Sequence, residues 1–229
     1  MSARMSSQPS IAILDARPAS QTASPAILFR LRVQAAGRVH AALLRCQVQI
    51  DARGRRYDGG ERQRLFELFG DASQFDRALR PITWAHASLV VQTFDGMIEC
   101  ELAVPCTYDL EVAAGKYLHA MREGDVPLQF LFSGTMFRVA DGALRVEPVP
   151  WDVDAAFRLP AGLWRAAMDQ HFPGGGWVRL ERETIDRLQA FRGRAALLTW
   201  DEAIGRLLES AGAVEAIGVP AEQASAARA

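Results

Sequence analysis

The sequence contains little lysine, little cysteine and no long apolar run. Lys116 is the only lysine beside 25 arginines, and 26 basic residues face 27 acidic ones, which leaves a net charge of −1. Such a balance provides no global field for nucleic acid or for an anionic membrane. No stretch approaches the roughly 18 consecutive apolar residues that a membrane span needs. The composition therefore disfavours nucleic acid and membrane as partners.

Motifs for chemistry are also missing from the sequence. The chain has no G-x-S-x-G nucleophile elbow, no glycine-rich phosphate loop and no cysteine spacing typical of zinc or iron–sulfur sites. Its four histidines are scattered along the chain. Because catalysis needs converging groups with perturbed pKa values, we predict that the protein is not an enzyme and uses no cofactor.

The three cysteines are Cys46, Cys100 and Cys106. They are odd in number and lie within apolar or strand-like patterns, which favours free thiols in the cytoplasm. We interpret them as small buried side chains. The alternative is a metal- or thiol-dependent protein that uses these cysteines, for example with Cys106 activated by His119.

The first two-thirds of the chain is patterned as β-strands. Apolar residues alternate with arginine or glutamine over residues 29–33 and 44–50, as expected for half-buried antiparallel strands. Ala35–Arg38 is predicted to link these two strands as a paired hairpin. An α+β fold follows, in which an antiparallel β-sandwich (immunoglobulin-like or similar) of about seven to nine strands precedes a helical C-terminal third.

Two Asp-Gly pairs predict tight hairpin turns. Asp95-Gly96 separates two β-rich runs, and Asp141-Gly142 separates two more. Between them, Leu110–Met121 and Val126–Ala140 are predicted to be long strands on either side of an acidic turn.

Helical signals lie mainly after residue 150. Helices are predicted over 160–172, 183–192 and 200–210, and a short one over 61–69 that ends at Gly70. Thr199 and Glu202 form a capping box. The predicted organisation is a flexible extension over 1–24, a sandwich domain over 25–150, a helical subdomain packed on it over 151–212 and a disordered tail over 213–229.

Residues 177–184, followed by two helices, have the strand–helix–helix order of ribbon-helix-helix DNA-binding proteins. Arg179 would project from such a ribbon. Acidic residues, including Glu181 and Glu183, lie among the arginines and disfavour DNA. DNA binding is therefore a third hypothesis, behind protein binding and metal or thiol chemistry.

Surface contacts with a partner are predicted at two places. Lys116 lies in the predicted strand Leu110–Met121, where it is either a marginal structural residue, buried against a carboxylate, or a contact residue. The second place is a basic loop, which is typically exposed. The contact candidates are Tyr108, Lys116, Tyr117, Arg53, Arg55, Arg56 and Tyr57.

Four segments carry a resemblance to a known family; they are Arg45–Gln47, Leu79–Trp84, Pro105–Phe137 and Thr199–Asp201. From about Phe29 to Leu208 the chain resembles a family of uncharacterised bacterial proteins common in actinobacteria, whose genes often lie beside those of high-affinity NiFe uptake hydrogenases. The resemblance implies no catalytic or cofactor residues. It implies an accessory or assembly role, with a hydrogenase subunit or maturation factor as the protein partner.

Overall fold

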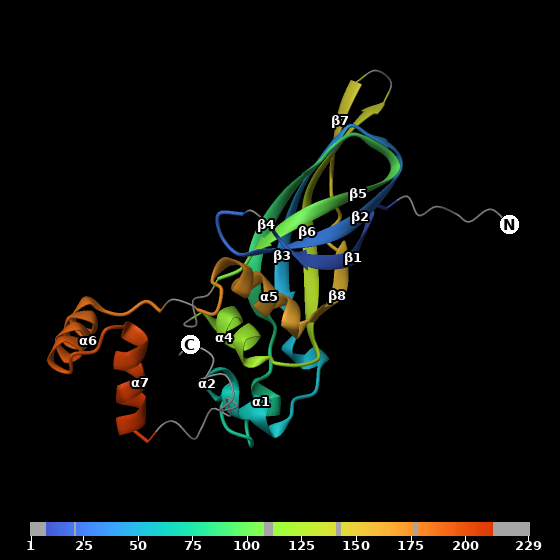
Figure 1. Ribbon diagram of the computed structural model, residues 1–229. Helices are drawn as coiled ribbons and strands as arrows, with labels where there is room; N and C mark the ends of the chain where they lie inside the picture. The colour runs from blue at the N-terminus through green and yellow to red at the C-terminus, as the bar shows by residue number, and fades with distance from the viewer. Residues whose placement is uncertain (1–7, 21, 108–111, 141–142, 176–177, 213–229) are drawn as a thin grey trace. The chain divides into compact units, whose positions relative to one another are not determined.

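The computed structural model describes residues 8–20, 22–107, 112–140, 143–175 and 178–212. These residues form a mixed α and β structure with eight strands in two antiparallel sheets and seven α-helices (Figure 1). The contacts divide the chain into a first unit, Met1–Val178, and a second unit, Arg179–Ala229. The division falls after Val178 and not at residue 150, so the segment from 151 to 178 belongs to the first unit.

The first sheet has the strand order β1-β2-β5. Its strands are β1 (Ser10–Pro18), β2 (Ala26–Val39) and β5 (Phe94–Pro105). Strand β1 lies within the segment predicted to be a flexible extension, and that prediction is wrong here. The backbone of β1 pairs with β2 along the register Ile11 to Val33, and the side chain of Ile11 is buried in the core.

The second sheet has five strands in which β6 pairs with three others. Its strands are β4 (Ile82–Val91), β3 (Ala41–Ile50), β6 (Asp125–Ala140), β7 (Ala143–Pro148) and β8 (Asp154–Pro160). One edge of β6 pairs with β3, whereas β8 and β7 pair with successive halves of the other edge (Figure 1). Strand β8 corrects the prediction that the helical region begins at residue 151.

The structure contradicts two of the predicted turns. Asp95-Gly96 lies inside β5, where Asp95 pairs with Arg38, so the predicted hairpin turn is wrong. Strands β4 and β5 belong to different sheets, and a two-residue hairpin turn joins only strands that pair. Likewise Ala35–Arg38 lies within β2, which does not pair with β3. Asp141-Gly142 lies outside the described residues, although the flanking Ala140 and Ala143 pair as predicted.

Both sheets contribute side chains to one hydrophobic core. The Phe29 ring of β2 lies edge-on to three rings of the second sheet, with centroid distances of 4.9 Å to Phe130, 5.8 Å to Phe157 and 6.3 Å to Trp84. The predicted inward residues of 44–50 are buried in this core. The alternation of residue types therefore identified the buried faces of β2 and β3 correctly.

Short helices gather at one end of the strands in the first unit (Figure 1). They are α1 (Gly59–Arg64), α2 (Phe66–Phe69), α3 (Phe75–Ala78), α4 (Ala113–Ala120) and α5 (Ala161–His171). The helix predicted over 61–69 is divided into α1 and α2 at Leu65 and ends at Gly70, which has a φ of 78°. The helix predicted over 160–172 is confirmed as α5.

Helix α4 replaces the strand predicted over Leu110–Met121, whose residues 110 and 111 lie outside the described residues. Ala114, Tyr117 and Leu118 recur at helical spacing and are at most 2% exposed. This spacing of three and four residues places them on one helical face, whereas a strand would put Tyr117 and Leu118 on opposite sides. The prediction of a strand was therefore wrong, because the apolar residues fit both periods and the buried face selects the helix.

The second unit contains α6 (Arg182–Arg194) and α7 (Trp200–Ser210). Both helices were predicted, and the capping box is confirmed because Thr199 Oγ1 accepts from the Glu202 amide while Glu202 reaches back to the Thr199 amide. The strand predicted over 177–180 is absent from its described residues, 178–180, and Trp177 lies outside them. The predicted tail over 213–229 also lies outside the described residues.

Candidate functional site: an arginine-lined hollow

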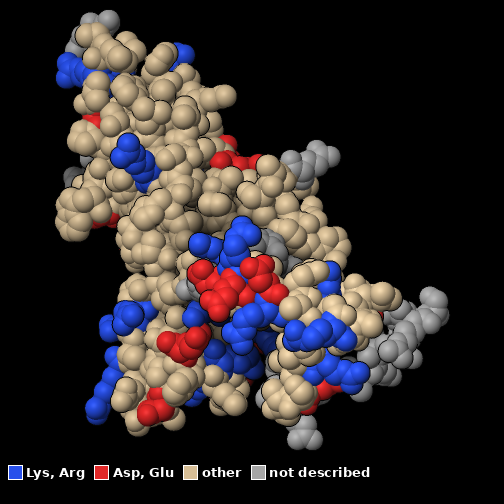
Figure 2. Space-filling model, turned by 90° about the vertical axis from the view of Figure 1, so that its left-hand side faces the viewer, with Lys and Arg blue, Asp and Glu red and all other residues tan. Residues whose placement is uncertain are grey.

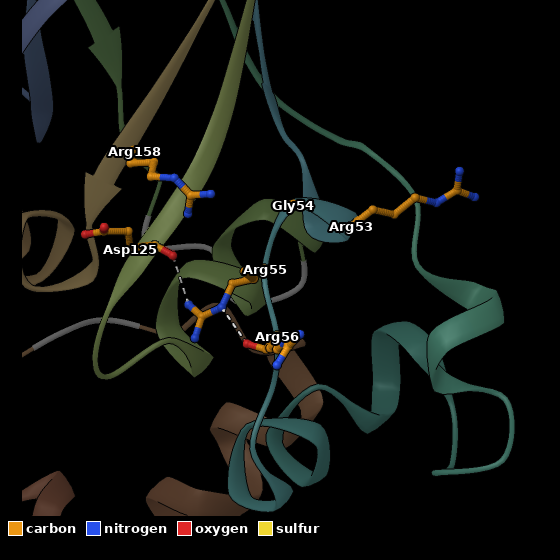
Figure 3. A pocket seen from close by; sticks show the side chains of 6 residues that line it. All are labelled: Arg53, Gly54, Arg55, Arg56, Asp125 and Arg158. Carbon is orange, nitrogen blue, oxygen red and sulfur yellow. Dashed lines mark hydrogen bonds between the residues drawn. The ribbon is translucent and has the colours of Figure 1, made fainter.

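A polar hollow of about 470 Å³ lies at the end of the strands where the short helices gather. It is lined by Arg53, Gly54, Arg55, Arg56, Asp125 and Arg158 (Figure 3). The three arginines of the loop were predicted contact residues. Asp125 begins β6 and Arg158 lies in β8, so segments far apart in the sequence complete the hollow.

The loop of the hollow is held against β6 by its backbone. The amide of Asp51 donates to the Pro127 carbonyl at 2.9 Å, and the Asp51 carbonyl accepts from the Gly54 amide at 3.0 Å. A β-carbon on Gly54 would lie 3.0 Å from the Pro127 Cβ, which is closer than side chains normally pack. Because Pro127 is also paired with Arg158 in the β6–β8 register, the loop and the β8 arginine share one support.

Arg55 is the anchored member of the set. Its Nη2 contacts Glu61 Oε1 at 2.5 Å, its Nη1 donates to the Asp125 carbonyl at 3.2 Å, and its guanidinium lies over the Tyr57 ring. The side chains of Arg55 and Glu61 are only 11% and 6% exposed. A buried, hydrogen-bonded ion pair of this kind fixes geometry and leaves little uncompensated charge.

Arg56 and Arg158 differ from Arg55 because both are exposed. Within the described part of the chain, neither guanidinium has a hydrogen bond or an ion pair with another residue. Arg53 lies between these two cases, since its Nε donates to the Leu79 carbonyl at 2.8 Å and its side chain extends away from the other arginines (Figure 3). Figure 3 also shows Arg158 reaching toward the space beside Arg55 and Asp125. Two free cationic groups thus border a hollow with a rigid floor.

Two predicted contact residues, Tyr57 and Tyr117, are structural instead. Tyr57 Oη donates to the Ala52 carbonyl at 2.6 Å and lies 2.7 Å from Tyr117 Oη. Burial raises the pKa of both phenols, so each stays neutral. The prediction of surface contacts is wrong for this pair, which ties α4 to the arginine loop. Tyr108 lies outside the described residues.

Lys116 is half-buried on α4 and belongs to an ion pair. Its Nζ lies 2.7 Å from Glu67 Oε2, where the lysine side chain is 28% exposed and the glutamate side chain 71% exposed. A carboxylate partner was one of the predicted alternatives, but the partner comes from α2 and not from the neighbouring acidic turn. An exposed pair of this kind contributes at most about 1 kcal/mol.

The cysteines do not converge into a metal site. Among the described residues, no group of three or more histidine, cysteine, aspartate or glutamate side chains is arranged to hold a metal ion. Cys46 and Cys106 are buried and Cys100 is half-buried. Burial raises the pKa of Cys46 and of Cys106 to about 12 and raises that of Cys100 as well, so the reactive thiolate is disfavoured at neutral pH. This burial argues against the thiol hypothesis.

The proposed Cys106–His119 pair finds no support in the described residues. The Cys106 thiol donates to the Val104 carbonyl at 3.9 Å, while the His119 ring packs edge-on against Trp164 at a centroid distance of 6.4 Å. The histidine therefore packs near α5, and no hydrogen bond joins it to the thiol among the described residues.

The sequence did not predict Glu61, Asp125 and Arg158 as residues of this site. The sequence predicts Glu61 only as the start of a helix and Asp125 only as a possible partner for Lys116, and it places Arg158 in a helical region. The basic composition of the loop is a usable signal for Arg55 and Arg56. No local pattern brings Arg158 to that loop, because its position depends on the pairing of β6 with β8.

The charge on the face of the molecule shown in Figure 2 is mixed. Basic and acidic side chains lie in small neighbouring groups, and no large field of one sign is visible there. Within the described ranges, no helix is long and apolar enough to cross a membrane.

Comparisons with known proteins place the chain in a family. A comparison with curated proteins found no match. Residues 6–216 match a family described as a family of unknown function, DUF6084. Because this match covers far more than half of the chain, the protein belongs to the family of unknown function DUF6084.

Proposed function

We propose that this protein is a non-catalytic binding protein whose arginine-lined hollow receives an acidic segment of a protein partner. The observation that carries the proposal is the pair of exposed, unpartnered guanidiniums, Arg56 and Arg158, beside a hollow of about 470 Å³ within the described structure. Arginine presents a planar fork of donors that matches a carboxylate in a two-point contact. It is also enriched in protein–protein interfaces.

The anchoring of Arg55 supports recognition over a purely structural role for the loop. Arg55 and Glu61 neutralise each other inside the floor, so Arg56 and Arg158 add positive potential at the opening without a nearby partner apart from Asp125. Because the backbone of the loop is held to β6, a ligand would order only side chains on binding. Preorganisation of this kind reduces the entropic cost of association.

The scaffold under the site fits the same role. We propose that the two sheets form a β-sandwich, supported by the direct packing of Phe29 against Phe130 across the core. A packed sandwich holds its loops at fixed positions, and loops on rigid scaffolds commonly carry binding residues. The hollow at one end of the strands would then be a binding surface of the usual kind for such a scaffold.

For the identity of the partner, we propose a subunit or maturation factor of a NiFe uptake hydrogenase, in the cytoplasm. The support is the resemblance in sequence described above, together with free thiols in an odd number. The arginine site refines that proposal, because it predicts that the partner presents glutamate or aspartate side chains.

A labelled decaglutamate peptide provides the first test of the hollow. Fluorescence anisotropy at low ionic strength should show binding to the wild type, and the double variant Arg56→Glu, Arg158→Glu should bind roughly 100-fold more weakly, because two charge-assisted contacts become repulsive. The matched control is Arg45→Glu, an exposed arginine on β3 away from the hollow. Equal affinity for the wild type and the double variant would show that the hollow is not the acidic-segment site.

A further inference from the structure

The second unit lacks a core of its own. Among its described residues, α6 contains no buried side chain and α7 buries only Ala203. Helices of 13 and 11 residues are marginal in water without tertiary packing. Large apolar side chains remain exposed on this helical hairpin; they are Ile185 at 43%, Leu198 at 86%, Trp200 at 40%, Ile204 at 43%, Leu207 at 36% and Leu208 at 47%. A surface of this kind marks an interaction site.

A groove between α6 and α7 has the character of a helix-binding site. It has a volume of about 420 Å³, and Leu188, Phe191 and Leu207 contribute its apolar surface. Arg187 and Arg194 also line it and supply positive charge. Its complement would be an amphipathic helix with an apolar face between acidic flanks, as in other helix-in-groove complexes.

Helix α7 itself meets this description. Ile204 and Leu208 are spaced four residues apart and are exposed on one face, and the helix carries three acidic residues against one arginine. Helix α6 is opposite in sign, with four arginines against two acidic residues. The hairpin thus contains both a basic, apolar groove and an acidic, apolar helix. That combination is self-complementary under a two-fold axis.

We propose that the α6–α7 hairpin pairs with the hairpin of a second copy of this chain. In the pair, Ile204 and Leu208 of each α7 enter the groove of the other copy, so that four helices enclose one core. Acidic residues of α7 then face Arg187 and Arg194 of the opposite α6. Arg192, whose guanidinium lies 4.3 Å over the Trp200 ring, holds α6 to α7 beside the loop that joins them, at the closed end of each hairpin. This inference is independent of the arginine-lined hollow in the first unit.

Sedimentation equilibrium of the full chain tests the pairing. The wild type should sediment with twice the monomer mass of 25.1 kDa at micromolar concentration, and Leu208→Asp should sediment as a monomer. The matched control is Val90→Asp, the same kind of change at a valine on β4 that is 67% exposed, and it should remain a dimer. Circular dichroism would show whether the β-sheet signal is unchanged in each variant.

A second variant tests the charge complementarity of the proposed pair and leaves its apolar side chains unchanged. Arg187→Glu combined with Arg194→Glu should weaken the dimer at least about tenfold, because it places like charges against α7 of the second copy. A wild-type protein that is monomeric at all concentrations would overturn the pairing, whether the hairpin then docks on its own chain or on another protein. A dimer that survives both Leu208→Asp and the double arginine reversal would overturn it as well.

Discussion

The two units of the chain bury their apolar side chains to very different degrees. In the first unit, Phe29, Leu31 and Phe130 are fully buried and both sheets contribute to a continuous cluster. In the second unit, the described part buries Ala203 alone, and Ile204 and Leu208 stay exposed. The first unit therefore has a continuous core, whereas the apolar face of the helical hairpin is the surface that we propose a second copy covers. The substitutions below test this difference in burial between the two units.

The largest effect is expected for Gly134→Ala in β6. Gly134 has a φ of +143°, and a β-carbon there would lie 2.0 Å from the carbonyl oxygen of Leu43 on the paired strand β3. Since two backbone segments must separate to admit the methyl group, we expect a loss of more than about 4 kcal/mol in unfolding free energy. Urea denaturation followed by circular dichroism measures this loss.

The matched control for that substitution is Gly37→Ala. Gly37 also has a positive φ, +67°, but a β-carbon added at this residue would have no atom within 4 Å apart from those of the glycine and its two chain neighbours. Only the backbone cost of about 1–2 kcal/mol should appear. Equal losses in the two variants would mean that close strand contact at Gly134 does not limit the stability of the first unit.

The next prediction compares truncation of a leucine side chain to alanine in each of the two units. Leu31→Ala removes a side chain that is 0% exposed and should cost about 3 kcal/mol, because a cavity remains. Leu208→Ala removes one that is 47% exposed and should change the unfolding free energy of the first unit by less than about 0.5 kcal/mol. Urea denaturation followed by circular dichroism measures both losses of unfolding free energy. Similar losses in the two variants would contradict the difference in burial between the units.

Alkaline pH should weaken the first unit through its buried thiols. The pKa of Cys46 and of Cys106 rises from 9.0 to about 12 on folding, so the folded state holds these protons more tightly than the unfolded state. Their contribution is complete below pH 9 and declines as the pH rises toward 12. Each thiol should lower the stability by about 1.4 kcal/mol at about pH 10.

Cys46→Ala provides the check on this pH dependence. The difference in unfolding free energy between about pH 8 and about pH 10 should shrink by the contribution of this one thiol, about 1.4 kcal/mol, in the variant. Tyr57 and Tyr117, whose pKa values are also raised, act in the same direction at still higher pH. A pH dependence identical to that of the wild type would show that the Cys46 thiol is not the titrating group.

The smallest effect is expected for Lys116→Glu. The lysine pairs with a largely exposed glutamate, Glu67, so its reversal should cost less than about 1 kcal/mol. It should also leave binding at the arginine-lined hollow unchanged, since the ion pair lies outside the lining of that hollow. Anisotropy with decaglutamate measures the second point, and a strong loss of affinity there would restore Lys116 as a contact residue.

Local patterns explain which parts of the fold could be predicted. Alternation in 44–50 identified the buried face of β3, and the capping box at Thr199 identified the start of α7, because both signals lie within a few residues. Asp95-Gly96 led to a wrong prediction of a hairpin turn. The turn preference of this pair is local, whereas the assignment of β4 and β5 to different sheets depends on contacts between distant parts of the chain. Tyr117 belongs to a helix whose buried face is defined by contact with Tyr57, 60 residues away.

Local sequence likewise indicated some residues of the candidate site and not others. The exposed loop arginine Arg56 was found from composition alone. Arg158 was not, because only the pairing of β6 with β8 brings it to the loop. The role of Arg55 as an anchor likewise depends on a buried glutamate that has no sequence signature.

Affinity capture from the native host tests the central claim, that the protein acts by binding a protein through Arg56 and Arg158. Tagged wild type, Arg45→Glu and the double variant Arg56→Glu, Arg158→Glu would be compared by quantitative mass spectrometry. We expect a protein that wild type and Arg45→Glu retain in near-stoichiometric amounts and that the double variant loses. Identical sets of captured proteins for all three would contradict the account.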